Sequence, residues 1–132
     1  MNIYKILKNL NIKALNNEDV PVSCLIIKDN KILVKEYNKR NKNNNPFDHA
    51  EILAIQKAAK ILKTYNLSDC ILYTTLKPCK MCEEVIKESK IKTVIYILNK
   101  TTQNNNKINY YKIDDNKGYF EKEIKDFFKQ KR

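Results

Sequence analysis

The first third of the chain changes from a helical to a strand-like pattern of apolar positions. In the first 15 residues the apolar side chains recur every three or four positions, which predicts an amphipathic helix. The apolar runs at 20–28 and 32–37 are separated by Asp29 and Asn30, a pair that favours a tight turn. The pattern therefore predicts a helix followed by an antiparallel hairpin of two strands.

The rest of the chain alternates helical and strand-like segments. Residues 48–63 carry apolar side chains close to helical periodicity, and Pro78 suits the first turn of a helix over 79–89. Apolar runs at 70–75 and 93–98 predict strands, and a strand after a crossover helix is usually parallel to its predecessor. The remaining segments are predicted to be loops at 38–46 and 99–109, a last strand at 108–113 and a terminal helix at 119–131. We therefore expect an α/β fold with a mixed sheet, antiparallel in its opening hairpin and parallel in its later strands.

Length and charge limit the possible functions. At 132 residues the chain is expected to form one domain, residues 1–132, with a substantial buried core. Lysine plus arginine number 26 against 15 acidic residues, and the net charge of +11 permits binding to RNA phosphates. An AT-rich genome would also enrich lysine, asparagine and isoleucine, so charge alone does not establish an RNA partner. No apolar run is long enough to span a membrane and no signal-peptide pattern is present, so a cytoplasmic location is expected.

The candidate chemistry lies at the start of the second and third predicted helices. His49 is the only histidine, and Glu51 follows it in the first turn of its helix. Cys79 and Cys82 open the next helix, where positions three apart share a face and the helix N-terminus favours the thiolate. One imidazole and two thiolates would leave the fourth position of a tetrahedral Zn²⁺ open to water, as in catalytic sites. Zinc would lower the pKa of that water to about 7, and Glu51 would accept its proton.

Each motif alone has a simpler explanation. A single Cys-x-x-Cys also fits a redox pair, half of a structural zinc site or two core thiols, and a lone histidine is most often a packed or surface residue. The combination of His-x-Glu at one helix start with Pro-Cys-x-x-Cys at another favours catalytic zinc. The other two cysteines, Cys24 and Cys70, lie in strand-like apolar runs and are expected to be buried thiols without a disulfide.

Residues 49–51 (His-Ala-Glu) and 78–82 (Pro-Cys-Lys-Met-Cys) together resemble the zinc-dependent cytidine deaminase superfamily. Within it, the chain is most similar to the bacterial tRNA-specific adenosine deaminases, over residues 20–99. Further matching segments are Val20-Pro21-Val22, Tyr37-Asn38, 45–48, 72–76 and Asp126-Phe127-Phe128.

This resemblance implies a fold, a cofactor and a reaction. The fold would be a three-layer α/β/α arrangement, cytidine deaminase-like, around a central mixed sheet of roughly five strands. His49, Cys79 and Cys82 would hold one Zn²⁺ per chain, with Glu51 as the catalytic residue. The reaction would be conversion of adenosine to inosine at the wobble position in a tRNA anticodon stem-loop. The enzyme would be a homodimer that needs neither a nucleotide cofactor nor a membrane.

Several residues are candidate contacts for the substrate. By resemblance Asn38 hydrogen-bonds the target nucleotide, although an ordinary loop asparagine is the simpler interpretation. Phe127 and Phe128 correspond to a segment that lines RNA in the tRNA deaminases, where a ring can stack on a base. Core packing is nevertheless the more frequent role of such rings. Ser23 and Cys24 are expected near the pocket on the first strand.

The chain departs from the family pattern around the site. Lys77 replaces the usual glutamate before Pro-Cys, Glu83 and Glu84 replace small residues, and residues 97–100 replace Gly-Ala-x-Asp. Catalysis is therefore better supported than the identity of the substrate. A deaminase of a free base or nucleoside (guanine, cytosine or cytidine) is the alternative, because the segment after His49 also resembles the guanine deaminases. A non-catalytic, zinc-stabilised RNA-binding module is a third possibility, favoured only by the charge.

Overall fold

A mixed sheet forms the centre of the molecule. The computed structural model describes residues 2–100 and 107–130, and the five strands in these residues have the order β2-β1-β3-β4-β5. β1 (Ser23–Lys28) pairs antiparallel with β2 (Lys31–Tyr37) and with β3 (Ile71–Leu76). β4 (Thr93–Leu98) and β5 (Asn109–Lys112) extend the sheet in parallel with β3. The predicted arrangement of antiparallel hairpin and parallel later strands is confirmed.

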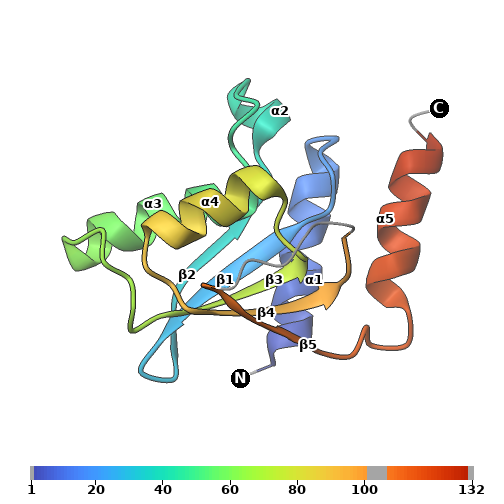
Figure 1. The fold of residues 1–132 in the computed structure, drawn as a ribbon. Coiled ribbons are helices and arrows are strands. Elements are labelled where there is room, and N and C mark those ends of the chain that lie inside the picture. The colour runs from blue at the N-terminus through green and yellow to red at the C-terminus, as the bar shows by residue number, and fades with distance from the viewer. Residues whose placement is uncertain (1, 101–106, 131–132) are drawn as a thin grey trace.

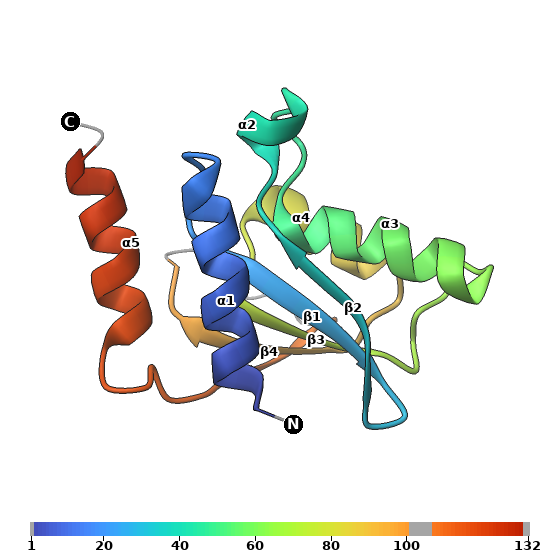
Figure 2. The ribbon, with the colours of Figure 1, turned by 180° about the vertical axis from the view of Figure 1, so that it is seen from behind.

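Helices cover both faces of this sheet (Figure 1). α1 (Ile3–Asn16) and α5 (Tyr119–Gln130) lie on one face, where the reverse view in Figure 2 shows them side by side. α3 (Ala50–Leu62) and α4 (Lys80–Glu88) lie on the other face. The three-layer α/β/α fold is therefore the one expected. None of the helices in the described residues is both long and apolar enough to cross a membrane.

β1 is buried on both sides and contributes to two cores. Cys24 and Ile26 belong to the core beneath α3 and α4, whereas Leu25 and Ile27 belong to the core beneath α1 and α5. Successive side chains of a strand point to opposite faces, so this one strand supplies both cores. A strand buried in this way forms a continuous apolar run instead of an alternating one. Cys70 also packs in the core beneath α3 and α4, so both remaining cysteines are buried thiols as predicted.

The opening hairpin differs from its prediction at the start of each strand, and β2 begins one residue earlier than expected. β1 begins at Ser23 instead of residue 20, because Val22 donates its N–H to a carbonyl two residues back at 2.8 Å. Pro21 has no N–H to donate to a neighbouring strand. The turn is as predicted: Asp29 and Asn30 have positive φ values of 52° and 61°, which the favoured two-residue hairpin turn requires.

The predicted loops differ more. Residues 38–46 contain α2 (Arg40–Asn43), a single helical turn that is capped by Asn44, whose φ is 49°. Of the loop predicted over 99–109, residues 101–106 lie outside the described residues, as does residue 131 of the predicted terminal helix. The last strand and the terminal helix themselves are present as β5 and α5.

The parallel strands bring the candidate motifs to one edge of the sheet. Leu76 at the end of β3 lies beside Leu98 at the end of β4, and Pro78 follows shortly after β3. α4 therefore starts at the carboxyl end of β3. Ligands of open α/β sheets bind at this edge, beside the N-termini of the adjoining helices.

Candidate metal centre and its pocket

The three predicted metal ligands come from the N-terminal ends of α3 and α4. His49 immediately precedes α3 and Cys79 immediately precedes α4, and neither side chain makes a hydrogen bond that caps its own helix. Cys82 lies in the first turn of α4 and is fully buried. The positive partial charge at a helix N-terminus stabilises a thiolate. The two helix starts thus supply three side chains that suit a cation.

Their donor atoms lie at distances that suit Zn²⁺. His49 Nδ1 lies 3.9 Å from Cys79 Sγ and 3.5 Å from Cys82 Sγ, and all three donors lie within 4.8 Å of one another. In a tetrahedral site with Zn–S of about 2.3 Å and Zn–N of about 2.0 Å, neighbouring donors lie about 3.5–3.8 Å apart. Both the spacing and the sulfur and imidazole donors therefore fit one zinc ion.

Protons are shared unequally among the three donors. Hydrogen bonds with Cys82 and His49 lower the pKa of Cys79 to about 3. The hydrogen bond to Cys79, together with burial, raises the pKa of Cys82. The hydrogen bond with Cys79 also raises the pKa of His49, against the effect of burial. Zinc binds thiolates, so binding of the ion would favour deprotonation of both cysteines.

Glu51 is the buried carboxylate of the site. Glu51 is only 4% exposed, and its Oε1 has no hydrogen-bond partner among the described residues. Burial raises the pKa of Glu51, partly offset by a backbone hydrogen bond and by the charge of His49. A buried carboxylate with an unpartnered oxygen is suited to accept and release a proton.

A cavity of about 410 Å³ opens over His49, Glu51 and Cys79, and we call it the metal pocket. Its remaining described wall consists of apolar side chains, one amide and three cations: Val20, Val22, Leu76, Ile124, Phe128, Asn38, Arg40, Lys77 and Lys100. This volume and the apolar wall suit a flat heteroaromatic base, and the cations suit phosphate groups.

Asn38 lies in the metal pocket and also holds the fold together. Its Oδ1 accepts a hydrogen bond from the Ala50 N–H at 2.9 Å, and its Nδ2 donates to the Val20 carbonyl at 3.2 Å. The amide therefore fixes the start of α3, next to His49, to the segment before β1. A primary amide has two donors and two acceptor lone pairs, so one of each remains for a ligand.

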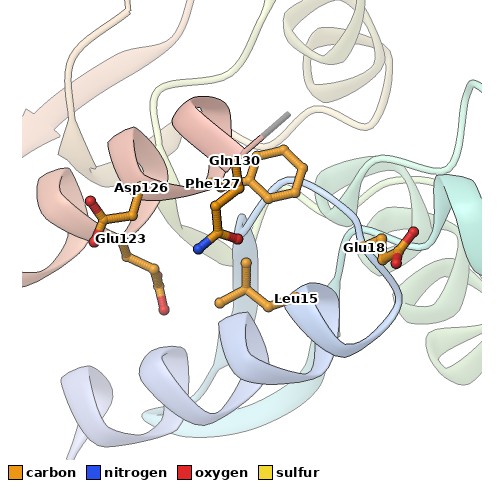
Figure 3. Close-up of a pocket in the computed structure, with 6 residues that line it drawn as sticks. All are labelled: Leu15, Glu18, Glu123, Asp126, Phe127 and Gln130. Carbon is orange, nitrogen blue, oxygen red and sulfur yellow. The ribbon is translucent and has the colours of Figure 1, made fainter. Parts of the chain in front are cut away.

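The two phenylalanines predicted to contact substrate line different cavities. Phe128 lines the metal pocket and is 51% exposed. Phe127 lines a second cavity of about 460 Å³ between α1 and α5 (Figure 3). Neighbouring side chains on a helix point about 100° apart, so two consecutive residues seldom contact one ligand. The structure thus brings Phe128, and not Phe127, to the candidate site.

Ser23 and Cys24 lie near the metal pocket, as expected, but do not line it. Both residues are fully buried: Ser23 Oγ donates to the Leu7 carbonyl at 3.1 Å, and Cys24 packs in the core. Val20 and Val22 line the pocket in their place, because the turn that precedes β1 carries them to its edge.

Ile124, Arg40 and Lys100 line the pocket but were not among the predicted substrate contacts. Ile124 precedes Phe128 by four positions, so helical spacing on α5 would have found it. Arg40 belongs to the short α2 and Lys100 follows β4. Neither lies in a periodic segment, and their proximity to His49 comes from the tertiary fold.

The fold and the donor set define an α/β protein with a zinc site at two helix N-termini. The family described as the cytidine and deoxycytidylate deaminase zinc-binding region matches residues 2–98. The chain therefore belongs to this family of deaminases. Its relatives identify zinc as the metal for which the donors of His49, Cys79 and Cys82 are suited.

Two curated relatives act on different substrates. The chain is 41% identical over 85 residues to the tRNA-specific adenosine deaminase of Rickettsia bellii, covering 63% of this chain and 59% of that protein. It is 43% identical over 76 residues to the guanine deaminase of Bacillus subtilis, covering 58% of this chain and 49% of that protein. The chain thus spans about half to three fifths of the length of these relatives. A solved structure of a tRNA:A34 deaminase is 21% identical and has a TM-score of 0.75, covering 83% of this chain and 95% of that one, which supports the fold.

Proposed function

We propose that the chain is a zinc-dependent hydrolytic deaminase that converts adenosine to inosine at the wobble position of a tRNA. The observation that carries the proposal is the buried Glu51 carboxylate beside the donors of His49, Cys79 and Cys82. Hydrolysis of an exocyclic C–N bond by a zinc deaminase needs metal ligands, a proton carrier and a cavity for the base, and the three donors, Glu51 and the metal pocket fit these needs.

Glu51 is the proton carrier of the proposed reaction. One Zn²⁺ per chain, held by His49, Cys79 and Cys82, would supply a Lewis acid that makes water a strong nucleophile near neutral pH. Glu51 accepts the proton of the attacking water and delivers protons to the ring nitrogen and then to the departing amine. Water adds to the ring carbon, the C–N bond breaks, and the products are inosine and ammonia. General acid–base catalysis of this kind contributes about 10²- to 10⁴-fold in rate.

The charge of the metal pocket favours a polynucleotide substrate. The exposed side chains of Arg40 and Lys100 line the pocket, and the chain carries a net charge of +11. A free base has no phosphate for these cations, whereas RNA has a phosphate on each side of the target nucleotide. Phe128, half exposed at the same pocket, offers a ring on which a base can stack. The proposed partner is a tRNA anticodon stem-loop, bound by a cytoplasmic homodimer as in the tRNA deaminases that the chain resembles.

Deamination of a free base is the second candidate function. The guanine deaminase of Bacillus subtilis is as similar to the chain as the Rickettsia protein is. The same zinc donors and the same Glu51 would act on guanine, because the chemistry at the ring carbon is alike. The amide of Asn38 keeps a donor and an acceptor for the edge of either purine.

Substrate choice can be measured directly. The zinc-loaded chain is incubated with an anticodon stem-loop that carries adenosine at position 34 and, in parallel, with guanine, cytosine, adenosine and cytidine. Inosine in the stem-loop supports the proposal, and a stem-loop with guanosine at that position is the matched control. Ammonia from guanine with an unchanged stem-loop would select the second candidate. Glu51→Ala should abolish either activity and retain zinc. If the unaltered chain, fully loaded with zinc, gives no product from any substrate, both candidate functions are contradicted and a zinc-stabilised binding module remains.

A further inference from the structure

Two buried charged residues flank the metal-binding segment 78–82. Lys77 precedes it and Glu83 follows it, and they are only 6% and 7% exposed. Both depart from the pattern of the deaminases that the chain resembles, which have glutamate at the first position and a small residue at the second. A buried charge needs a partner, because transfer from water to the interior costs several kcal/mol. The partners of these two residues therefore bear on how the segment is held.

One tyrosine contacts both flanking residues. The hydroxyl of Tyr110, in β5, donates to Glu83 Oε2 at 2.6 Å. The Nζ of Lys77 lies 4.7 Å from the centroid of the same tyrosine ring and 5.6 Å from that of Tyr96. The two rings meet edge to face, with centroids 6.1 Å apart. Residues on either side of the segment are thus bound to a single side chain of β5, a strand that supplies none of the three metal donors.

Backbone hydrogen bonds join one flanking residue to a metal donor and the other to β4. The N–H of Glu83 donates to the Cys79 carbonyl at 2.8 Å, and the N–H of Lys77 donates to the Leu98 carbonyl at 2.8 Å. A shift of Glu83 would therefore move the first turn of α4, which contains Cys82. A shift of Lys77 would move the chain that leads into Cys79.

We infer that Tyr110 is a positioning residue that fixes the separation of Cys79 and Cys82 before zinc binds. The inference rests on the metal site of the proposed function. A ligand set held in place by the fold loses less conformational freedom when the ion binds, so the ion binds more tightly. Residues that support metal ligands from outside typically contribute 10- to 100-fold in metal affinity, as an order of magnitude.

The chain offers two matched pairs of variants. Tyr110→Phe removes the hydroxyl that binds Glu83, and Tyr111→Phe makes the same change at the next residue of β5, which is 57% exposed. Glu83→Ala removes the acceptor of that hydroxyl. Glu84→Ala makes the same change at the next residue of α4, whose carboxylate forms an exposed ion pair with Lys87.

The dissociation constant for zinc is measured in competition with a chromophoric chelator, and far-UV circular dichroism checks that each variant is folded. Tyr110→Phe and Glu83→Ala are each expected to weaken zinc binding by about 10- to 100-fold, and the double variant no further, since both changes remove one hydrogen bond. Tyr111→Phe and Glu84→Ala should keep the affinity of the unaltered chain. At saturating zinc Tyr110→Phe should regain most of its deaminase activity, with an unchanged KM, which a merely destabilised fold would not show.

The possible outcomes separate this inference from the proposed function. Zinc dissociation constants within about twofold of the unaltered chain for Tyr110→Phe and Glu83→Ala would overturn the positioning role alone. If Tyr110→Phe fails to fold, Glu83→Ala, which restores the small residue usual in the family, decides the question. An unaltered chain that binds zinc but deaminates nothing would overturn the proposed function and leave the affinity comparison valid. An unaltered chain that binds no zinc would overturn both.

Discussion

α5 lies between two cavities of similar size and opposite charge. The metal pocket has about 410 Å³ and the second cavity about 460 Å³. Ile124 and Phe128 of α5 line the first, and Phe127 of the same helix lines the second (Figure 3). The metal pocket is lined by cations beside its zinc donors, whereas the second cavity is lined by the carboxylates Glu18, Glu123 and Asp126. Volume therefore does not identify the active site in this molecule; the donors in its wall do.

Each cavity also contains a glutamate whose pKa is raised by burial. Glu123 accepts hydrogen bonds from Asn11 Nδ2 at 2.8 Å and from the Tyr119 hydroxyl at 3.5 Å. Glu51 Oε1 has no such partner within residues 2–100 and 107–130. Glu123 thus joins α5 to α1, and Glu51 keeps an oxygen for a ligand. A raised pKa alone does not distinguish a catalytic carboxylate from a structural one, but the hydrogen-bond partners do.

The largest expected effects, on zinc content and on the deamination rate, come from the zinc ligands of the metal pocket. Cys82→Ala removes one of three zinc ligands, so we expect zinc content to fall close to zero and the deamination rate to fall by about 10⁴-fold or more. Metal analysis and a deaminase assay measure the two quantities. Glu18→Gln changes a carboxylate that lines the second cavity, and it should alter neither the zinc content nor the deamination rate. Loss of zinc in Glu18→Gln, or full zinc content in Cys82→Ala, would mean that the metal binds elsewhere.

The second largest expected effect is on kcat, and it distinguishes Glu51 from Glu123. Glu51→Gln keeps the size of the side chain but cannot carry a proton, so we expect kcat to fall by about 10²- to 10⁴-fold with zinc content unchanged. Glu123→Gln should leave kcat within about twofold, because its oxygen still accepts from Asn11. Equal loss of activity in both variants would remove the distinction between the two carboxylates.

The two phenylalanines provide a smaller contrast. Phe128→Ala should raise KM for an anticodon stem-loop by about 5- to 150-fold, since stacking on one base is worth about 1–3 kcal/mol. Phe127→Ala should leave KM unchanged and lower the melting temperature, because Phe127 lines the cavity between the two helices. A KM effect in Phe127→Ala alone would place the RNA on the other side of α5.

These phenylalanines also mark the limit of what the sequence could predict. The spacing of His49, Glu51, Cys79 and Cys82 predicted both the donor set and its place at two helix starts, because the relevant geometry is local to each helix. The sequence predicted a terminal helix but not which of its faces meets the pocket, since that depends on how α5 is rotated against its neighbours. The contacts of Tyr110 likewise join β5 to α4 and leave no local pattern.

The cations of the metal pocket should have a modest, salt-dependent effect. Arg40→Gln and Lys100→Gln each remove one charge available to phosphate, so the slope of log affinity against log salt for a stem-loop should decrease by about 0.7–0.9 per variant. Filter binding at several salt concentrations measures this slope. Glu18→Gln should leave it unchanged, since that carboxylate lines the other cavity. A slope that is the same in all three variants would contradict RNA phosphate binding at the metal pocket.

The smallest expected effect is on the free energy of unfolding, and it concerns Glu123 in the second cavity. Burial raises the pKa of Glu123 above its ordinary value of 4.5, so ionisation of this carboxylate disfavours the folded state. Glu123→Gln and the unaltered chain should be equally stable below pH 4.5, where Glu123 is protonated in both the folded and the unfolded chain. As the pH rises through the pKa of the folded state, the unaltered chain loses this contribution and the variant does not. Since the side chain is partly exposed and screened by solvent, the advantage of Glu123→Gln at pH 7 should be at most about 0.5 kcal/mol in urea denaturation. An advantage that grows on acidification would show that the carboxylate stabilises the fold through its charge, and the contrast with Glu51 would then rest on catalysis alone.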